Sequence, residues 1–140
     1  MTKITNGMKA GFLATGVLSL LMLVKSAMGI MPALDVVNML SAMMGMPDAP
    51  IVGWMAHFAI GTIMWGTLFA VLAPHLPGTN YTLKGMFFGI MVWLLMMIMV
   101  MPAAGLGLFG MTLLLHLMFG MVLGAAYGMS ARKLIFGNMK

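Results

Sequence analysis

Four apolar segments, each close to the length that a helix needs to cross a lipid bilayer, dominate this sequence. They run near residues 10–31, 53–73, 85–101 and 111–131. A helix rises about 1.5 Å per residue, so about 20 apolar residues cross the ~30 Å hydrocarbon core. Prolines and glycines between the segments mark helix ends. We therefore predict an all-α integral membrane protein, a single transmembrane domain over residues 1–140 built as a four-helix bundle.

The charge content supports the same class and excludes others. Of the 140 residues, 63% are hydrophobic and 6% are charged, whereas a soluble domain carries about 25% charged residues. The net charge is +5, but the seven basic residues are scattered and form no stripe typical of nucleic-acid binding. Cysteine is absent, which excludes disulfides and thiolate metal sites. The expected partner is the lipid bilayer, and no nucleic acid.

The basic residues predict the orientation of the chain. Short loops rich in Lys and Arg stay in the cytoplasm. In a four-span arrangement Asp35 and Asp48, the two acidic residues, fall on one side of the membrane. The other side holds Lys3, Lys9, Lys84, Arg132, Lys133 and Lys140. Both termini are therefore expected in the cytoplasm.

The loop between the first two spans contains an amphipathic pattern at about residues 35–45. At 100° per residue, Asp35, Asn38 and Ser41 share one arc, and the valines, Leu40 and the methionines share the other. This predicts a helix of about three turns, capped by Asp35 or a neighbour. It would lie flat on the outer membrane surface, or fold as a lid onto helices of this chain or of a partner.

Two sets of residues recur along the chain. His57 and His116 each precede a glycine by four residues, and the first and third spans each open with a lysine followed by glycines. This predicts two similar helical hairpins in tandem, related by an axis along the membrane normal. The lysines and glycines that would match are Lys9, Gly11 and Gly16 in the first span and Lys84, Gly85 and Gly89 in the third.

Small residues spaced by four allow close helix contacts in lipid. The predicted packing positions are Gly61, Gly85, Gly89, Gly120, Gly124 and Gly128. Packing within the bundle is the simplest interpretation, and oligomer contacts or space for a flat cofactor are the alternatives.

A few polar residues at membrane depth are candidates for chemistry. Lys25 lies about six residues before the expected outer end of the first span. Its side chain would either snorkel to the surface or act as a counter-ion to Asp35 or to an anionic ligand. His57 and His116 are expected at similar depth in the outer leaflet. They would be hydrogen-bonded core residues or axial ligands of haem b.

Methionine is abundant, at 22 residues. Thioethers suit Cu(I), so histidine with methionine would make a copper site, although methionine is also a flexible hydrophobe that fills gaps. There is no Glu, no phosphate-binding loop and no pair of carboxylates within a span. No catalytic residues are assigned, and enzymatic activity is not predicted.

The chain resembles a family of small prokaryotic four-helix membrane proteins known only as a domain of unknown function. The resemblance covers about the last two-thirds of the chain, and it implies a bacterial or archaeal inner membrane but no activity. It rests on residues 85–93, residues 101–110, His116 with Gly120, Gly124, Tyr127 and Gly128, and in the second span Gly53-Trp54, His57 and Trp65-Gly66.

The leading functional hypothesis is a non-catalytic accessory or scaffold subunit of a larger membrane complex, with other membrane subunits or self-association as partners. Glycine seams and a methionine-rich surface favour helix partners. The alternatives are a redox protein that binds haem b or copper through His57 and His116, and a small oligomeric transporter or channel.

Overall fold

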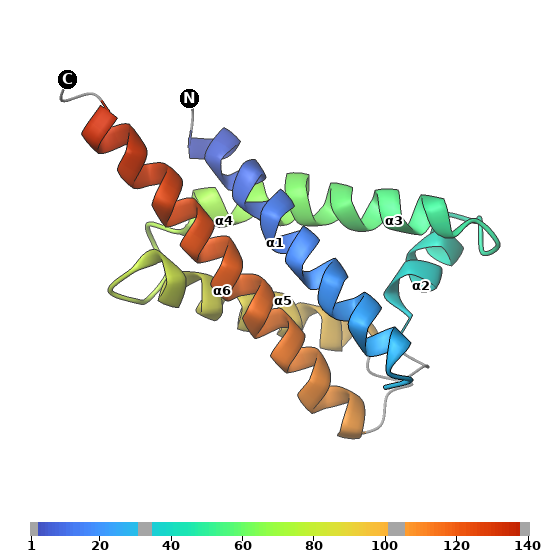
Figure 1. Ribbon diagram of the computed structural model, residues 1–140. Coiled ribbons are helices and arrows are strands. Elements are labelled where there is room, and N and C mark those ends of the chain that lie inside the picture. Colours follow the sequence, from blue (N-terminus) through green and yellow to red (C-terminus); the bar gives the residue numbers. More distant parts are fainter. Residues whose placement is uncertain (1–2, 31–34, 101–105, 138–140) are drawn as a thin grey trace.

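The computed structural model describes residues 3–30, 35–100 and 106–137, and all regular structure in these ranges is helical (Figure 1). Four stretches are long and apolar enough to cross a membrane: Lys3–Ala27, Pro50–Leu72, Tyr81–Ile98 and Phe109–Arg132. The all-α class and the presence of four long apolar helices are thus confirmed. The helices are α1 (Lys3–Ala27), α2 (Val36–Met43), α3 (Pro50–Ala59), the π-helix η1 (Ile60–Trp65), α4 (Gly66–Leu72), α5 (Tyr81–Val100) and α6 (Leu106–Gly137).

The charges divide between the two ends of the bundle. α1 begins and α6 ends at one end, where the α4–α5 turn also lies (Figure 1). We call it the basic end, because it carries Lys3, Lys9, Lys84 and Arg132. The opposite end, with α2, carries both aspartates and is called the acidic end. At the basic end the Lys84 ammonium donates a 2.8 Å hydrogen bond to the Ala73 carbonyl, just past the last residue of α4.

The first span ends earlier than predicted, at Ala27. Gly29 has a φ of +66°, and the Gly29 and Ile30 amides donate to the Ser26 and Lys25 carbonyls. This hydrogen-bond pattern closes a helix at a left-handed glycine. Gly29, and not the later proline, therefore stops the span.

Each pair of consecutive spans forms a hairpin held together by glycines. In the first hairpin, α1 packs on the span made of α3, η1 and α4, and a Cβ on Gly11 would lie 2.9 Å from the Gly66 Cα and would also meet the Gly61 carbonyl. In the second, α5 packs on α6, and a Cβ on Gly85 would lie 2.8 Å from the Gly124 Cα and collide with the Gly120 carbonyl. Backbones this close exclude any side chain.

These contacts relate the two hairpins residue by residue. Gly11 corresponds to Gly85, and Gly61 and Gly66 correspond to Gly120 and Gly124. The predicted match between Gly16 and Gly89 does not hold. A Cβ on Gly16 would meet nothing within 4 Å, so Gly16 is not part of the contact between the two helices of the first hairpin. Thr15 occupies the place of Gly89 instead, since Thr15 meets Gly61 as Gly89 meets Gly120.

The π-helix η1 explains a difference of one residue between the hairpins. Gly61 and Gly66 are five positions apart, whereas Gly120 and Gly124 are four apart. In an α-helix, residues five apart point in different directions, and a π turn accommodates one extra residue. η1 thereby keeps Gly61 and Gly66 on the side of the span that faces α1.

The two hairpins meet through α1 and α6 and through an aromatic cluster. Ala10 and Ala14 are buried on α1, which lies against α6. Phe88 of α5 is 1% exposed and contacts Trp65 and Phe69 of the second span, with ring centroids 6.0 and 5.3 Å apart. Phe69 also meets Tyr127 of α6 at 5.5 Å. Aromatic side chains therefore join the second span to the second hairpin.

α2 packs against α3 and is not a detached surface helix. Val37 and Ser41 are buried, and a Cβ on Gly53 of α3 would collide with the Val37 carbonyl. The predicted Asp35 cap is present, because the Asp35 carboxylate accepts from the Asn38 amide at 3.0 Å. α2 is thus the lid of the second alternative, folded onto the chain's own helix, and its Met43 and Met44 remain exposed.

Candidate functional site

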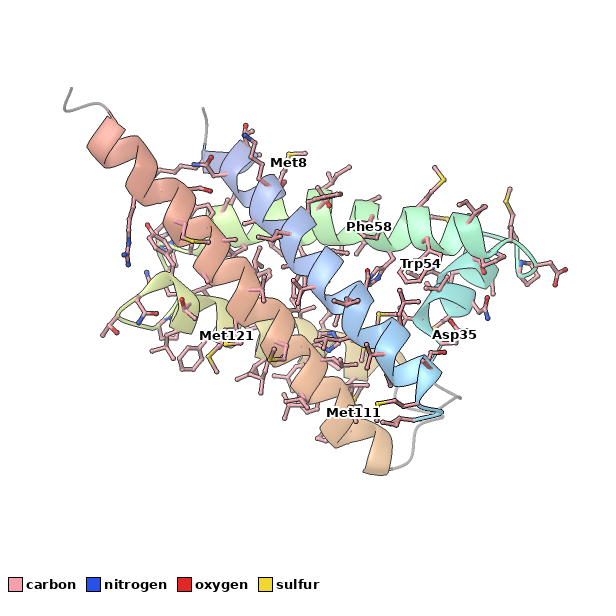
Figure 2. The ribbon with its side chains drawn as sticks, viewed as in Figure 1. Met8, Asp35, Trp54, Phe58, Met111 and Met121 are labelled. Carbon is pink, nitrogen blue, oxygen red and sulfur yellow. The ribbon has the colours of Figure 1, made fainter. Side chains whose placement is uncertain are left out.

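The polar residues of the acidic end gather around a pocket of about 290 Å³ between α1, α2 and α3. α1 contacts η1 and α4 more extensively than α3, and α2 packs beside α3 where the two diverge. Lys25 and Asp35 both line this pocket, together with Ser26, Asn38 and Trp54. In Figure 2, Asp35 and Trp54 lie beside the last turns of α1. Both residues of the predicted charge pair therefore line one pocket, and the pairing itself stays a prediction.

The prediction placed Lys25 about six residues before the end of the first span. The structure places it nearer to the end of that helix. Since α1 stops at Ala27, Lys25 belongs to its last turn, where a cation also favours the helix dipole. The residue is nevertheless 8% exposed. The Asp35 carboxylate is engaged by α2, accepting from the Asn38 amide and, at 2.7 Å, from the Asn38 side chain.

His57 lies on α3, about two helical turns from the start of its span at Pro50. Its ring contacts Trp54 and Phe58 of the same helix, each with centroids 6.0 Å apart. The His57 Nε2 atom is buried without a hydrogen-bond partner, and the same holds for Ser19 Oγ and Thr62 Oγ1. All three atoms belong to the first hairpin.

His116 occupies the corresponding place on α6, about two turns from the start of its span at Phe109. Its Nδ1 donates a 2.7 Å hydrogen bond to the Thr112 carbonyl, which leaves Nε2 as the nitrogen with a lone pair. The Thr112 hydroxyl accepts from Trp93 Nε1 and donates to the Phe109 carbonyl, both at 3.1 Å. This network ties α5 to α6.

The hairpin correspondence extends to the residues around the two histidines. Ser19 stands where the second hairpin has Trp93, and Gly53 stands where it has Thr112. Gly53 has no side chain to accept a hydrogen bond, and its open side is occupied by α2. The first hairpin therefore lacks the Trp–Thr bond of the second.

The two histidines lie at matching positions but in different hairpins, and among the described residues no ring contact joins them. In that part of the chain no three His, Cys, Asp or Glu residues gather as metal ligands. Binding of haem b or copper stays a prediction. The hydrogen bonds that join Thr112 to Trp93 and to His116 were not predicted from the sequence. A threonine four residues before His116 was the available signal, since positions i and i+4 are neighbours on a helix.

The predicted packing glycines belong to both hairpins. Gly61 faces α1, Gly85 and Gly89 face α6, and Gly120 and Gly124 face α5. Gly128 lies against the ring of Tyr81. None of these glycines lines the pocket at the acidic end.

No curated protein and no solved structure matches the chain. The model of a family of unknown function matches residues 1–134, which include the first span and α2 as well as the region of the expected resemblance. Together with the four apolar spans, this match shows that the chain is a multi-pass membrane protein that belongs to the family of unknown function DUF6789.

Proposed function

We propose that this protein is a non-catalytic accessory or scaffold subunit of a larger membrane complex. The observation that carries the proposal is a set of exposed methionines at the acidic end, Met28, Met43, Met44 and Met46, which we call the methionine surface. These side chains are 67%, 67%, 59% and 54% exposed, and none lies within the four candidate spans. Large apolar side chains outside the spans favour a cover, and residues 3–30, 35–100 and 106–137 leave these four exposed.

Methionine suits a surface that docks a partner. Its unbranched, polarisable side chain adapts to irregular shapes, and methionine-rich surfaces recur at binding sites. Close glycine contacts within the hairpins and the packing of α2 on α3 support this surface from beneath. The partner we expect is another membrane protein with an apolar surface at the same level.

We further propose that the chain lies in a prokaryotic inner membrane with both termini in the cytoplasm. The support is the separation of basic and acidic ends, together with the positive-inside rule. The chain has no native cysteine, so single-cysteine variants report topology directly. In intact cells, Asp48→Cys should react with an impermeant maleimide and Lys84→Cys should not. The reverse pattern would contradict this orientation.

The scaffold role is tested by purification from native membranes in mild detergent. A stoichiometric partner should be retained by the wild-type chain and lost by the triple variant Met43→Ala, Met44→Ala and Met46→Ala. A matched triple variant, Met64→Ala, Met91→Ala and Met129→Ala, removes similarly exposed methionines from the spans and should retain the partner. Solute flux by the purified protein alone in liposomes, with no partner retained, would contradict the scaffold role.

A further inference from the structure

A groove of about 410 Å³ opens between α1 and α6 at the basic end. Lys9 lines one side and Arg132 the other. Both residues are exposed. The groove therefore has a cation from each of the two helices at its rim.

The rest of the lining is apolar apart from one hydroxyl. Leu13 and Met129 line the groove and are 50% and 58% exposed, while Ala10 and Ala126 are buried. Ser130 follows Met129 on α6 and contributes the hydroxyl. Cations and a hydroxyl thus stand beside an apolar wall, which matches the chemistry of an amphiphile with an anionic head.

Neither acidic side chain of this protein lies at the end of the bundle where the groove opens. The chain has two acidic residues, Asp35 and Asp48, and both belong to the acidic end. Lys3 and Lys84 add further positive charge at the basic end. The field at the groove is therefore positive, and it favours an anion from outside the chain.

We propose that this groove is a binding site for an anionic phospholipid. The lipid phosphate lies between Lys9 and Arg132, the Ser130 hydroxyl donates to a phosphate or ester oxygen, and one acyl chain runs along Leu13 and Met129. Basic pockets between membrane helices are suited to such head groups. The site is independent of the proposed scaffold role, because it lies at the opposite end from the methionine surface.

Native mass spectrometry of the full-length protein in detergent tests the proposal. The lipids to titrate are 1-palmitoyl-2-oleoyl phosphatidylglycerol and, for comparison, the zwitterionic phosphatidylcholine with the same chains. We expect tighter binding of phosphatidylglycerol. One basic residue near an anionic lipid contributes about fivefold in affinity, so Lys9→Gln and Arg132→Gln should each weaken that binding about fivefold.

Two control variants distinguish a lipid in the groove from a general attraction of anions to the basic end. Lys3→Gln removes the same charge from the same helix outside the groove and should change the affinity little. Leu13→Trp fills the apolar wall and should weaken lipid binding. Equal binding of the two lipids would overturn the proposal. So would full competition by inorganic phosphate with no effect of Leu13→Trp, because that result describes a free-anion site.

Folding of the variants is checked alongside binding. Each variant is scored only if its helicity and elution volume match those of the wild type. If the Lys9 variant misfolds, the Arg132 variant carries the test, because the two cations lie on different helices of the groove.

Discussion

Replacing Gly85 by alanine should destabilise the second hairpin strongly. The added methyl would lie 2.8 Å from both the Cα and N atoms of Gly124 and would collide with the Gly120 carbonyl. Carbon atoms in contact prefer separations of about 3.5–4.0 Å. All three obstructing atoms belong to the backbone, so no side-chain rotation can relieve the clash, and α5 and α6 must separate by roughly 1 Å.

The expected loss of stability is about 3 kcal/mol. Overpacking a well-filled interface typically costs about 1–3 kcal/mol. We expect the upper end of that range, because a gap of about 1 Å forfeits up to half of each dispersion contact. The pairing of α5 with α6 is the most extensive helix contact among the described residues, so many such contacts are affected.

Unfolding in mixed micelles of dodecyl sulfate and dodecyl maltoside measures this loss. Trp93 of α5 packs against Phe109 of α6 with ring centroids 4.5 Å apart, so the Trp93 contribution to the tryptophan fluorescence reports separation of the two helices. The matched control is Gly16→Ala, because a methyl there meets nothing within 4 Å and alanine favours the helix. Equal unfolding midpoints for Gly85→Ala and Gly16→Ala would refute the packing argument.

Three further outcomes are expected. Deletion of Ile63 from η1 should convert the π turn to α-helix and be tolerated. Deletion of Leu68 from α4 should instead rotate the rest of the span by about 100° and abolish folding. Elution volume and unfolding midpoint measure both outcomes. Lys84→Met should lose the hydrogen bond to the Ala73 carbonyl and lower the unfolding free energy by about 1–2 kcal/mol, while Lys3→Met should not. Protein purified from haem-replete cells should show no Soret band, and a band lost on substituting either histidine by alanine would instead establish haem ligation.

The features that follow from residue type and spacing were predictable from the sequence. The length and hydropathy of the apolar stretches indicated the four spans, and the polar arc beginning at Asp35 indicated the short helix with its cap. Gly61, Gly120 and Gly124 stood out because each sits in an apolar run at a spacing of four from a histidine or another glycine. Such signals are local, and local signals are what a single sequence contains.

The features that depend on tertiary contact were not predictable. Nothing local distinguishes the π turn at Ile60–Trp65 from an α-helix, because it arises from the need to aim both Gly61 and Gly66 at α1. Gly7 lies before the apolar run, yet it packs against Gly66. The hydrogen-bond donor to the Thr112 hydroxyl is Trp93 on the neighbouring helix. A choice between a structural and a ligand role for His116 requires knowledge of such contacts between helices.

The separation of charge between the two ends also couples this protein to the voltage across its membrane. In the proposed orientation, Lys3, Lys9, Lys84 and Arg132 all lie on the cytoplasmic side, which is electrically negative in an energised membrane. Moving one elementary charge through 100 mV costs about 2.3 kcal/mol. Inverting these four residues would therefore cost about 9 kcal/mol at 100 mV, so an energised membrane should hold the bundle in one orientation after insertion and resist its reversal.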